Sequence, residues 1–168
     1  MIRIAGAALL MAGCAIFGYS LAAASRREMR QLRQLLGAVQ EMEWELKYRL
    51  TELPELCRIA ADAAGGKLRL LFRELADRLD RREVTQVTAS FNALLSRQDF
   101  PRRVRQNLCQ LGRSLGRFDL EGQLQGLEAV RCQCRKDLKE LEAGSVQRQR
   151  SYQTLALCAG ASLIILLL

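Results

Sequence analysis

The 168-residue chain has no histidine, only two prolines and only 5 % aromatic residues. Without histidine, the commonest general base and metal ligand is missing. Sandwiches and barrels need many turns and strands rich in β-branched and aromatic residues, so these shortages disfavour an all-β fold. Six cysteines in a chain of this length do not form the framework of a disulfide-rich scaffold.

Charged residues are nearly absent from both ends of the chain. Apart from Arg3, all 26 basic and 18 acidic residues lie within 26–150, so this middle segment carries 25 − 18 = +7 of the total charge of +8. We therefore expect a transmembrane segment over 1–25, a helical domain over 26–150 and a hydrophobic membrane segment over 151–168.

The N-terminal apolar run, Ile4–Ala24, has the length of a membrane span. As a helix its 21 residues extend about 32 Å, which matches a hydrocarbon core of about 30 Å. The small residues Ala22, Ala23 and Ala24 also fit a cleavage site, so a cleaved secretory signal is the competing interpretation. The run exceeds the usual apolar core of a signal, about 7–15 residues, and this favours a retained anchor.

The C-terminal apolar run, Thr154–Leu168, is shorter. It would extend about 22 Å as a helix, or about 27 Å with Ser151, Tyr152 and Gln153 at the interface, enough for a thin bilayer. A core helix of the central domain is the alternative interpretation.

Arginines flank both apolar runs on the side of the central segment, which predicts a cytoplasmic location for that segment because basic residues next to spans stay in the cytoplasm. They are Arg26, Arg27, Arg30, Arg33, Arg148 and Arg150. In the cytoplasm Cys57, Cys109, Cys132 and Cys134 would remain reduced.

Apolar residues of the central segment recur every three or four positions, the spacing of amphipathic helices. These stripes cover Leu32–Leu46, Leu68–Leu79, Val84–Leu95, Val104–Leu115 and Leu120–Leu141. The last stripe can continue into the C-terminal run. Because the connections between the stripes are short, we predict an all-α fold, an antiparallel helical bundle flanked by the two membrane segments.

Residues typical of helix ends lie between the stripes. Thr51 is a candidate N-cap for a short helix that has Pro54 in its first turn and is stopped by Gly65-Gly66. Asp99-Phe100-Pro101 is typical of a cap followed by a helix start. Gly116 is a candidate C-cap, and Asp119 is a candidate N-cap for the next helix.

The sequence contains no recognisable catalytic or metal motif, so we expect neither an enzyme nor a bound cofactor. Gly65-Gly66-Lys67 lacks the spacing of a phosphate-binding loop. Cys132 and Cys134 are two residues apart and would point about 200° away from each other on a helix, so they cannot converge on one metal ion. Glu41, Glu43 and Glu45 are interpreted as solvated or paired with Lys47 and Arg49.

A cluster of arginines is the densest cationic feature away from the apolar runs. It consists of Arg102, Arg103, Arg105, Arg113 and Arg117. Three interpretations remain open: charge that is solvated or faces an anionic membrane, a protein-docking face, and a nucleic-acid site. The absence of interleaved aromatic residues disfavours nucleic acid.

Three strings of residues carry a family resemblance. They are Leu111-Gly112-x-x-Leu115-Gly116-x-x-Asp119-x-x-x-Gln123, Met42-Glu43-x-Glu45-Leu46-x-Tyr48 and Thr51-x-Leu53-Pro54-Glu55. Together with the apolar ends, they make the chain resemble the stage III sporulation protein AB family over essentially its whole length.

This resemblance implies a role in endospore formation, within an assembly that links mother cell and forespore. The family's cytoplasmic domain is similar to the F domain of type II secretion platform proteins, which engage an ATPase from the cytoplasmic side. The implied partners are the ATPase stage III sporulation protein AA and other subunits of the stage III sporulation complex, at the mother-cell membrane facing the forespore. Homo-oligomerisation is a further possibility. The implied structural motif residues are Thr51, Pro54, Gly112, Gly116, Asp119 and Gln123.

Overall fold

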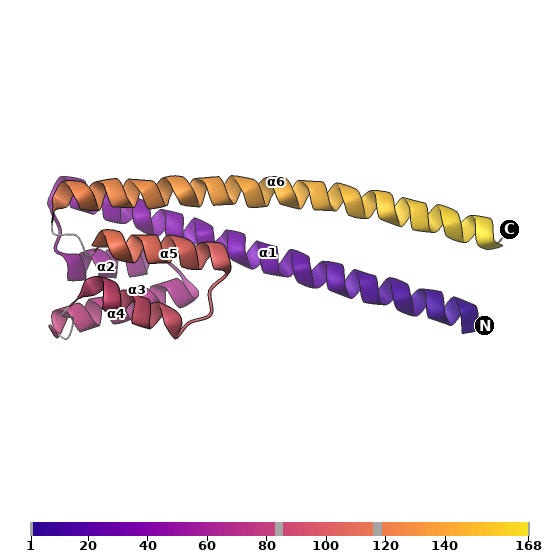
Figure 1. Ribbon diagram of the computed structural model, residues 1–168, viewed down its shortest axis with the longest axis horizontal. Coiled ribbons are helices and arrows are strands. Elements are labelled where there is room, and N and C mark those ends of the chain that lie inside the picture. Colours follow the sequence, from indigo (N-terminus) through magenta and orange to yellow (C-terminus); the bar gives the residue numbers. More distant parts are fainter. Residues whose placement is uncertain (1, 83–85, 116–118, 168) are drawn as a thin grey trace. The chain divides into compact units, whose positions relative to one another are not determined.

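The computed structural model is all-helical over the residues that it describes, which are 2–82, 86–115 and 119–167 for the backbone and 23–82, 86–115 and 119–144 for the side chains (Figure 1). The helices in these ranges are α1 (Ile2–Arg49), α2 (Leu53–Ala63), α3 (Gly66–Asp80), α4 (Val87–Ser96), α5 (Arg102–Leu115) and α6 (Leu120–Leu167). The prediction of an all-α fold is confirmed, and α6 continues beyond the last apolar stripe.

The chain divides into two compact units, one made of Met1–Arg26 with Lys139–Leu168 and the other of Arg27–Leu138. In the second unit, α2 packs against α3, α3 against α4, and α4 against α5. Figure 1 shows these four short helices together, beside the parts of α1 and α6 that belong to the same unit. The first unit consists of the outer parts of the two long helices.

The apolar stripes form the core of the second unit. Side chains with no exposed surface come from α1, α2, α3, α4, α5 and α6, and they include Leu32, Leu35, Met42, Leu56, Leu71, Phe72, Phe91, Leu108, Leu111 and Leu127. Phe72 and Phe91 meet with ring centroids 6.4 Å apart. Every helix of this unit therefore buries one face against the others, as the helical periodicity requires.

One predicted helix boundary is wrong. The residue before α2 is Glu52, not Thr51, and no side chain caps this helix. The Thr51 hydroxyl instead donates a hydrogen bond to Glu45 Oε2 at 3.0 Å. Leu50 has a left-handed backbone conformation, with φ of 52°. This turn separates α1 from α2 and directs Thr51 back towards α1.

Other boundaries agree with the sequence. Pro54 lies in the first turn of α2. The helix ends before Gly65, and Gly66 has φ of +55°, a conformation that favours glycine. Helix α5 begins directly after Pro101, whose carbonyl accepts the Arg105 amide at 2.9 Å.

The predicted membrane segments fall mainly on residues whose side chains lie outside the described ranges. Among the residues that were described, no helix is long and apolar enough to span a bilayer.

Candidate functional site: the arginine-rich helix α5

Helix α5 has one buried face and one exposed, cationic face. It contains four arginines and no acidic residue. The buried face comprises Val104, Asn107, Leu108, Leu111, Gly112, Ser114 and Leu115. Arg102, Arg105 and Arg113 are exposed. The helix thus contributes apolar contacts to the core while presenting positive charge to solvent.

Two of the predicted docking arginines project from nearly the same line of the helix. Arg102 and Arg113 are separated by about three turns, so their directions differ by about 20° and their Cα atoms by about 16 Å along the axis. Neither side chain forms a hydrogen bond or an ion pair with another described residue. We call Arg102, Arg105 and Arg113 the arginine face.

Arg103 points to a different neighbour. Its guanidinium lies 3.7 Å from Asp137 Oδ1 on α6, and its side chain is only 35 % exposed. The Asp137 side chain is 9 % exposed and accepts further hydrogen bonds from Asn107 Nδ2 at 2.7 Å and Gln133 Nε2 at 2.9 Å. Arg103 therefore helps to neutralise a buried carboxylate between α5 and α6. It is less available to a docking partner than the exposed arginines of α5.

Arg105 has a partly structural role. Its Nη2 atom lies 3.4 Å from the carbonyl oxygens of both Leu95 and Gln98. Leu95 lies in the last turn of α4 and Gln98 lies just after this helix, at the C-terminal end where backbone carbonyls carry partial negative charge. Arg105 thus joins α4 to α5 while its side chain stays accessible.

Two glycines let the helices on either side approach α5 closely. A Cβ atom on Gly112 would lie 2.6 Å from Phe91 Cδ1 of α4. A Cβ atom on Gly126 of α6 would lie 2.2 Å from the Ser114 hydroxyl. These two glycines are therefore close-packing positions, and their contacts fix the orientation of the arginine face.

Asp119 forms the predicted cap at the start of α6. Its Oδ2 accepts the Gly122 amide at 2.7 Å, and its carbonyl accepts the Gln123 amide at 3.1 Å. The motif residue Asp119 therefore caps the beginning of α6, where Gln123 contributes its backbone amide. The predicted C-cap Gly116 and docking candidate Arg117 lie outside the described residues.

The three glutamates of α1 have different surroundings. Glu41 is exposed, whereas Glu43 pairs with Arg131 Nε of α6 at 3.3 Å. Glu45 is buried and lies 3.3 Å from Arg49 Nη1. The predicted pairing with Arg49 is thus confirmed, but Lys47 instead lies 5.5 Å from the Tyr48 ring centroid.

The cysteines of the described unit are free. Cys132 is exposed and Cys134 is buried, as expected for residues two positions apart on a helix. Burial raises the pKa of the Cys57 thiol to about 12. Burial, assisted by the Asp137 charge, raises the pKa of Cys134 to about 12. Both buried thiols are therefore protonated and unreactive at neutral pH.

Of the predicted membrane-flanking arginines, Arg26, Arg27, Arg30 and Arg33 are exposed near the middle of α1. The side chains of Arg148 and Arg150 on α6 lie outside the described residues. Within the described part of the chain, no group of three or more potential ligands could hold a metal ion.

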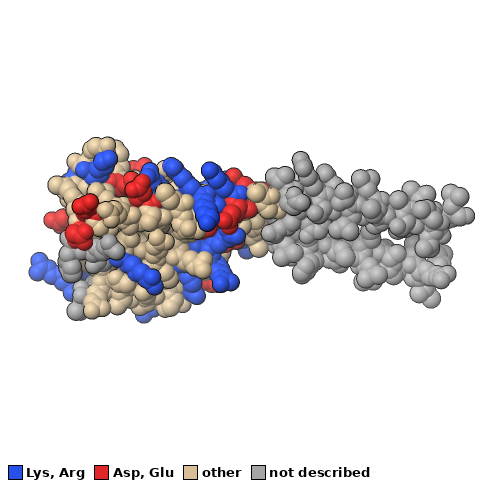
Figure 2. All heavy atoms as spheres, turned by 45° about the horizontal axis from the view of Figure 1, so that its top comes forward, with Lys and Arg blue, Asp and Glu red and all other residues tan. Residues whose placement is uncertain are grey.

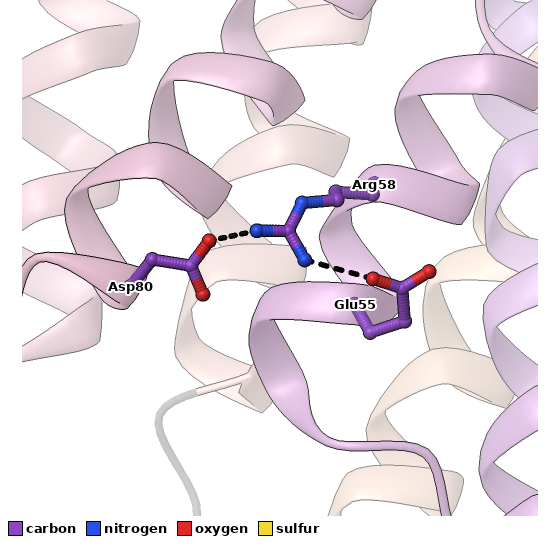
Figure 3. A network of polar contacts seen from close by, with 3 residues as sticks. All are labelled: Glu55, Arg58 and Asp80. Carbon is purple, nitrogen blue, oxygen red and sulfur yellow. Dashed lines mark hydrogen bonds and ion pairs between the residues drawn. The ribbon is translucent and has the colours of Figure 1, made fainter.

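The face of the described part that Figure 2 shows carries charges of both signs. One such group joins α2 to α3: Arg58 pairs with Asp80 and, at 2.8 Å, with Glu55 (Figure 3). Helix α3 further pairs Arg78 with Glu74 at 2.8 Å. In contrast, the acid-free α5 directs arginines to solvent, which makes its exposed face the candidate docking site.

The buried pair Asn107–Asp137 was not predicted from the sequence. A signal was present, because Asn107 follows Val104 by three residues and precedes Leu111 by four, which places it on the apolar stripe. Asp137 likewise follows the buried Cys134 by three residues. A polar residue at such a position indicates a buried hydrogen bond to another element.

Comparison with known proteins identifies the family. The model of the family described as Stage III sporulation protein AB matches residues 3–168. A protein of that name from Bacillus subtilis (strain 168) is 24 % identical over 171 residues, covering the whole of both chains. A solved structure of a Stage III sporulation protein AB aligns with a TM-score of 0.63 and 22 % identity, over 72 % of this chain and 98 % of that chain, and this likeness supports the fold. The chain belongs to the stage III sporulation protein AB family, and this membership supports a role in sporulation.

Proposed function

We propose that this chain is a membrane platform subunit of the mother cell–forespore secretion-like complex, and that its helical unit docks the complex's ATPase. The family membership supports the sporulation role. The apolar ends of the sequence support membrane attachment, and the arginines beside them support a cytoplasmic location for the helical unit. In this account the subunit lies in the mother-cell membrane facing the forespore.

The observation that carries the docking proposal is the arginine face of α5. Arg102 and Arg113 are exposed, share one side of the helix and have no acidic neighbour on it. The buried contacts of Gly112 and Asn107 hold this helix in place, so the charges are presented from a rigid element. A partner with an acidic surface would be steered to this face over long range.

The role proposed for the chain is binding and positioning, with ATP hydrolysis carried out by the partner, stage III sporulation protein AA. Other subunits of the stage III sporulation complex, and further copies of this chain, would contact the platform from within the membrane. This assignment of binding to the chain and ATP hydrolysis to its partner agrees with the sequence, which predicts packed helices and positive charge but contains no recognisable catalytic motif.

The cytoplasmic location of the helical unit can be tested by labelling a thiol that is exposed in the structure. Cys57 has no exposed surface and a raised pKa, whereas Cys132 is exposed. In intact cells a membrane-impermeant maleimide should label Cys132 only after permeabilisation, and Cys57 should require denaturation as well. Labelling of Cys132 in unpermeabilised cells would contradict the cytoplasmic location. A Cys132→Ser variant gives the background from the other thiols.

The docking test uses the purified full chain and purified stage III sporulation protein AA in neutral detergent, where no anionic bilayer competes. The variant R102E/R113E should weaken binding about tenfold, because it reverses two accessible charges without touching the core. The matched control is R73E/K136E, which makes the same charge change at exposed positions on α3 and α6.

Equal affinity for the wild type and R102E/R113E, with both folded by circular dichroism, would refute docking through this face. Equal weakening by R73E/K136E would indicate that only net charge matters. If R102E/R113E instead lost binding to vesicles containing anionic phosphatidylglycerol and kept ATPase binding, the arginine face would be a lipid-binding surface, the alternative function.

A further inference from the structure

A second surface of the same unit exposes aromatic rings at the end of α1. Trp44, Tyr48 and Leu50 are 49 %, 64 % and 66 % exposed, and they are three of the five large hydrophobic residues exposed in the described part of the chain. All three lie within seven consecutive residues. We call Trp44, Lys47, Tyr48, Arg49 and Leu50 the aromatic surface.

The rings of this surface are held in a defined arrangement. Trp44 and Tyr48 are one helical turn apart, and their ring centroids are separated by 5.5 Å. The Arg49 guanidinium lies 5.3 Å from the Trp44 ring centroid, and Lys47 Nζ lies 5.5 Å from that of Tyr48. Contacts of this kind restrict the side chains before any partner binds, which lowers the entropy lost on association.

Leu50 adds a strained backbone next to the rings. Its φ of 52° is a left-handed conformation that a leucine adopts at a cost, because the Cβ atom crowds the backbone. The next residue, Thr51, is held in place because its hydroxyl donates a hydrogen bond to Oε2 of the buried Glu45 at 3.0 Å. The turn thus fixes an exposed apolar side chain two residues after Tyr48, although this side chain contributes nothing to the core.

We infer that the aromatic surface is a second docking site, which binds a segment of a protein partner that combines an apolar side chain with carboxylates. Trp, Tyr and Arg are the residues most enriched among those that dominate binding energy at protein interfaces. The exposed charges within the surface, Lys47 and Arg49, are both positive. Arg49 is paired with the buried Glu45 at 3.3 Å, so Lys47 is the cation left for a partner. Acidic residues of the partner would therefore complement the rim around the rings.

Aromatic rings with neighbouring cations are also typical of membrane interfaces. The position on α1 favours a protein partner instead. In the proposed topology, Arg27 flanks the membrane. Trp44 lies 17 residues further along the same helix and in the same unit, which corresponds to about 26 Å along the helix axis and places it away from the membrane. The exclusion of lipid rests on that topology, but the docking site itself does not depend on ATPase binding to α5.

The test places the photoreactive residue p-benzoylphenylalanine at position 48 of the full chain, in sporulating cells, and identifies the crosslinked peptide by mass spectrometry. The expected product joins position 48 to a peptide of another protein that contains carboxylates beside an apolar residue. Adding Trp44→Ala or the charge reversal K47E, which leaves the Arg49–Glu45 pair intact, should lower its yield about tenfold, as for loss of an interface anchor.

The matched control carries the photoreactive residue at Leu70 of α3, which is also 64 % exposed but has no aromatic partner. It should not give the same product. If position 48 does not tolerate the replacement, the photoreactive residue at position 44 serves the same purpose.

Several results would overturn the inference. Crosslinks to lipid would show that the rings face a membrane, and crosslinks to a second copy of this chain would show self-association. The absence of any product at both positions 44 and 48, a yield unaffected by K47E, or the same product at position 70 would remove the docking site.

Discussion

Helices α3 and α5 are both rich in arginine, but they use it differently. On α3 and its neighbour α2, arginines meet acids on the surface: Arg58 with Asp80, and Arg78 with Glu74. Helix α5 has no acid of its own, and its arginines either reach across to other helices or remain in solvent. Charge that is neutralised within α2 and α3 adds little to binding, whereas the surplus on α5 is available to a partner.

The two helices also differ in how deeply their ion pairs are buried. Asp80 and Arg58 side chains are 41 % and 44 % exposed, while Asp137, the acid that faces α5, is 9 % exposed. Water screens the first pair. The buried Asp137 carboxylate has little contact with water, so its charge is stabilised by Arg103, Asn107 and Gln133. The same kind of interaction is therefore weak beside α3 and strong beside α5.

The largest predicted effect follows from this difference. Asp137→Ala should lower the free energy of unfolding by about 3 kcal/mol, because it leaves Asn107 and Arg103 without their buried acceptor. Asp80→Ala, its matched control, should cost less than about 1 kcal/mol. Chemical denaturation of the purified full chain in detergent, followed by circular dichroism, measures both. Similar losses for the two variants would contradict the comparison.

A smaller effect, with a change of sign, is expected for two glycines. Gly112→Ala should destabilise the protein by about 1–2 kcal/mol, because the new Cβ meets the buried Phe91 ring. Gly37→Ala on α1, where no atom lies within 4 Å of the new Cβ, should stabilise by up to about 1 kcal/mol through helix propensity. In thermal denaturation, the unfolding midpoint of Gly112→Ala should be lower than that of the wild type, and the midpoint of Gly37→Ala should be higher. A stabilising Gly112→Ala would show that α4 and α5 are not in close contact.

The smallest predicted stability change concerns the helix cap. Asp119→Ala should cost about 1 kcal/mol, since the Gly122 amide loses its acceptor at the start of α6. Asp119→Asn should retain most of the stability, because asparagine also caps well. Denaturation curves of the two variants separate capping from loss of charge. An unchanged stability for Asp119→Ala would leave a binding role as the better explanation of this residue.

Helical periodicity was sufficient to predict the all-α fold, because each helix buries a stripe with spacing of three and four residues. The cap at Asp119 was also predictable, since it depends on neighbours in sequence. Thr51 was not, because its hydroxyl is taken by Glu45, six residues away. Long-range pairing likewise determines which arginines are free: Arg102 and Arg103 are adjacent in sequence, but only Arg103 faces Asp137. Sequence periodicity cannot reveal partners on another helix.

The central claim is that the unpaired charge of α5, and not the paired charge on α2 and α3, attracts the ATPase. The most direct measurement is the association rate of the full chain with stage III sporulation protein AA over a series of salt concentrations. Rates for the wild type and R73E/K136E should fall steeply and in parallel as salt screens the attraction, whereas R102E/R113E should start lower and vary little. Three parallel curves would contradict the account.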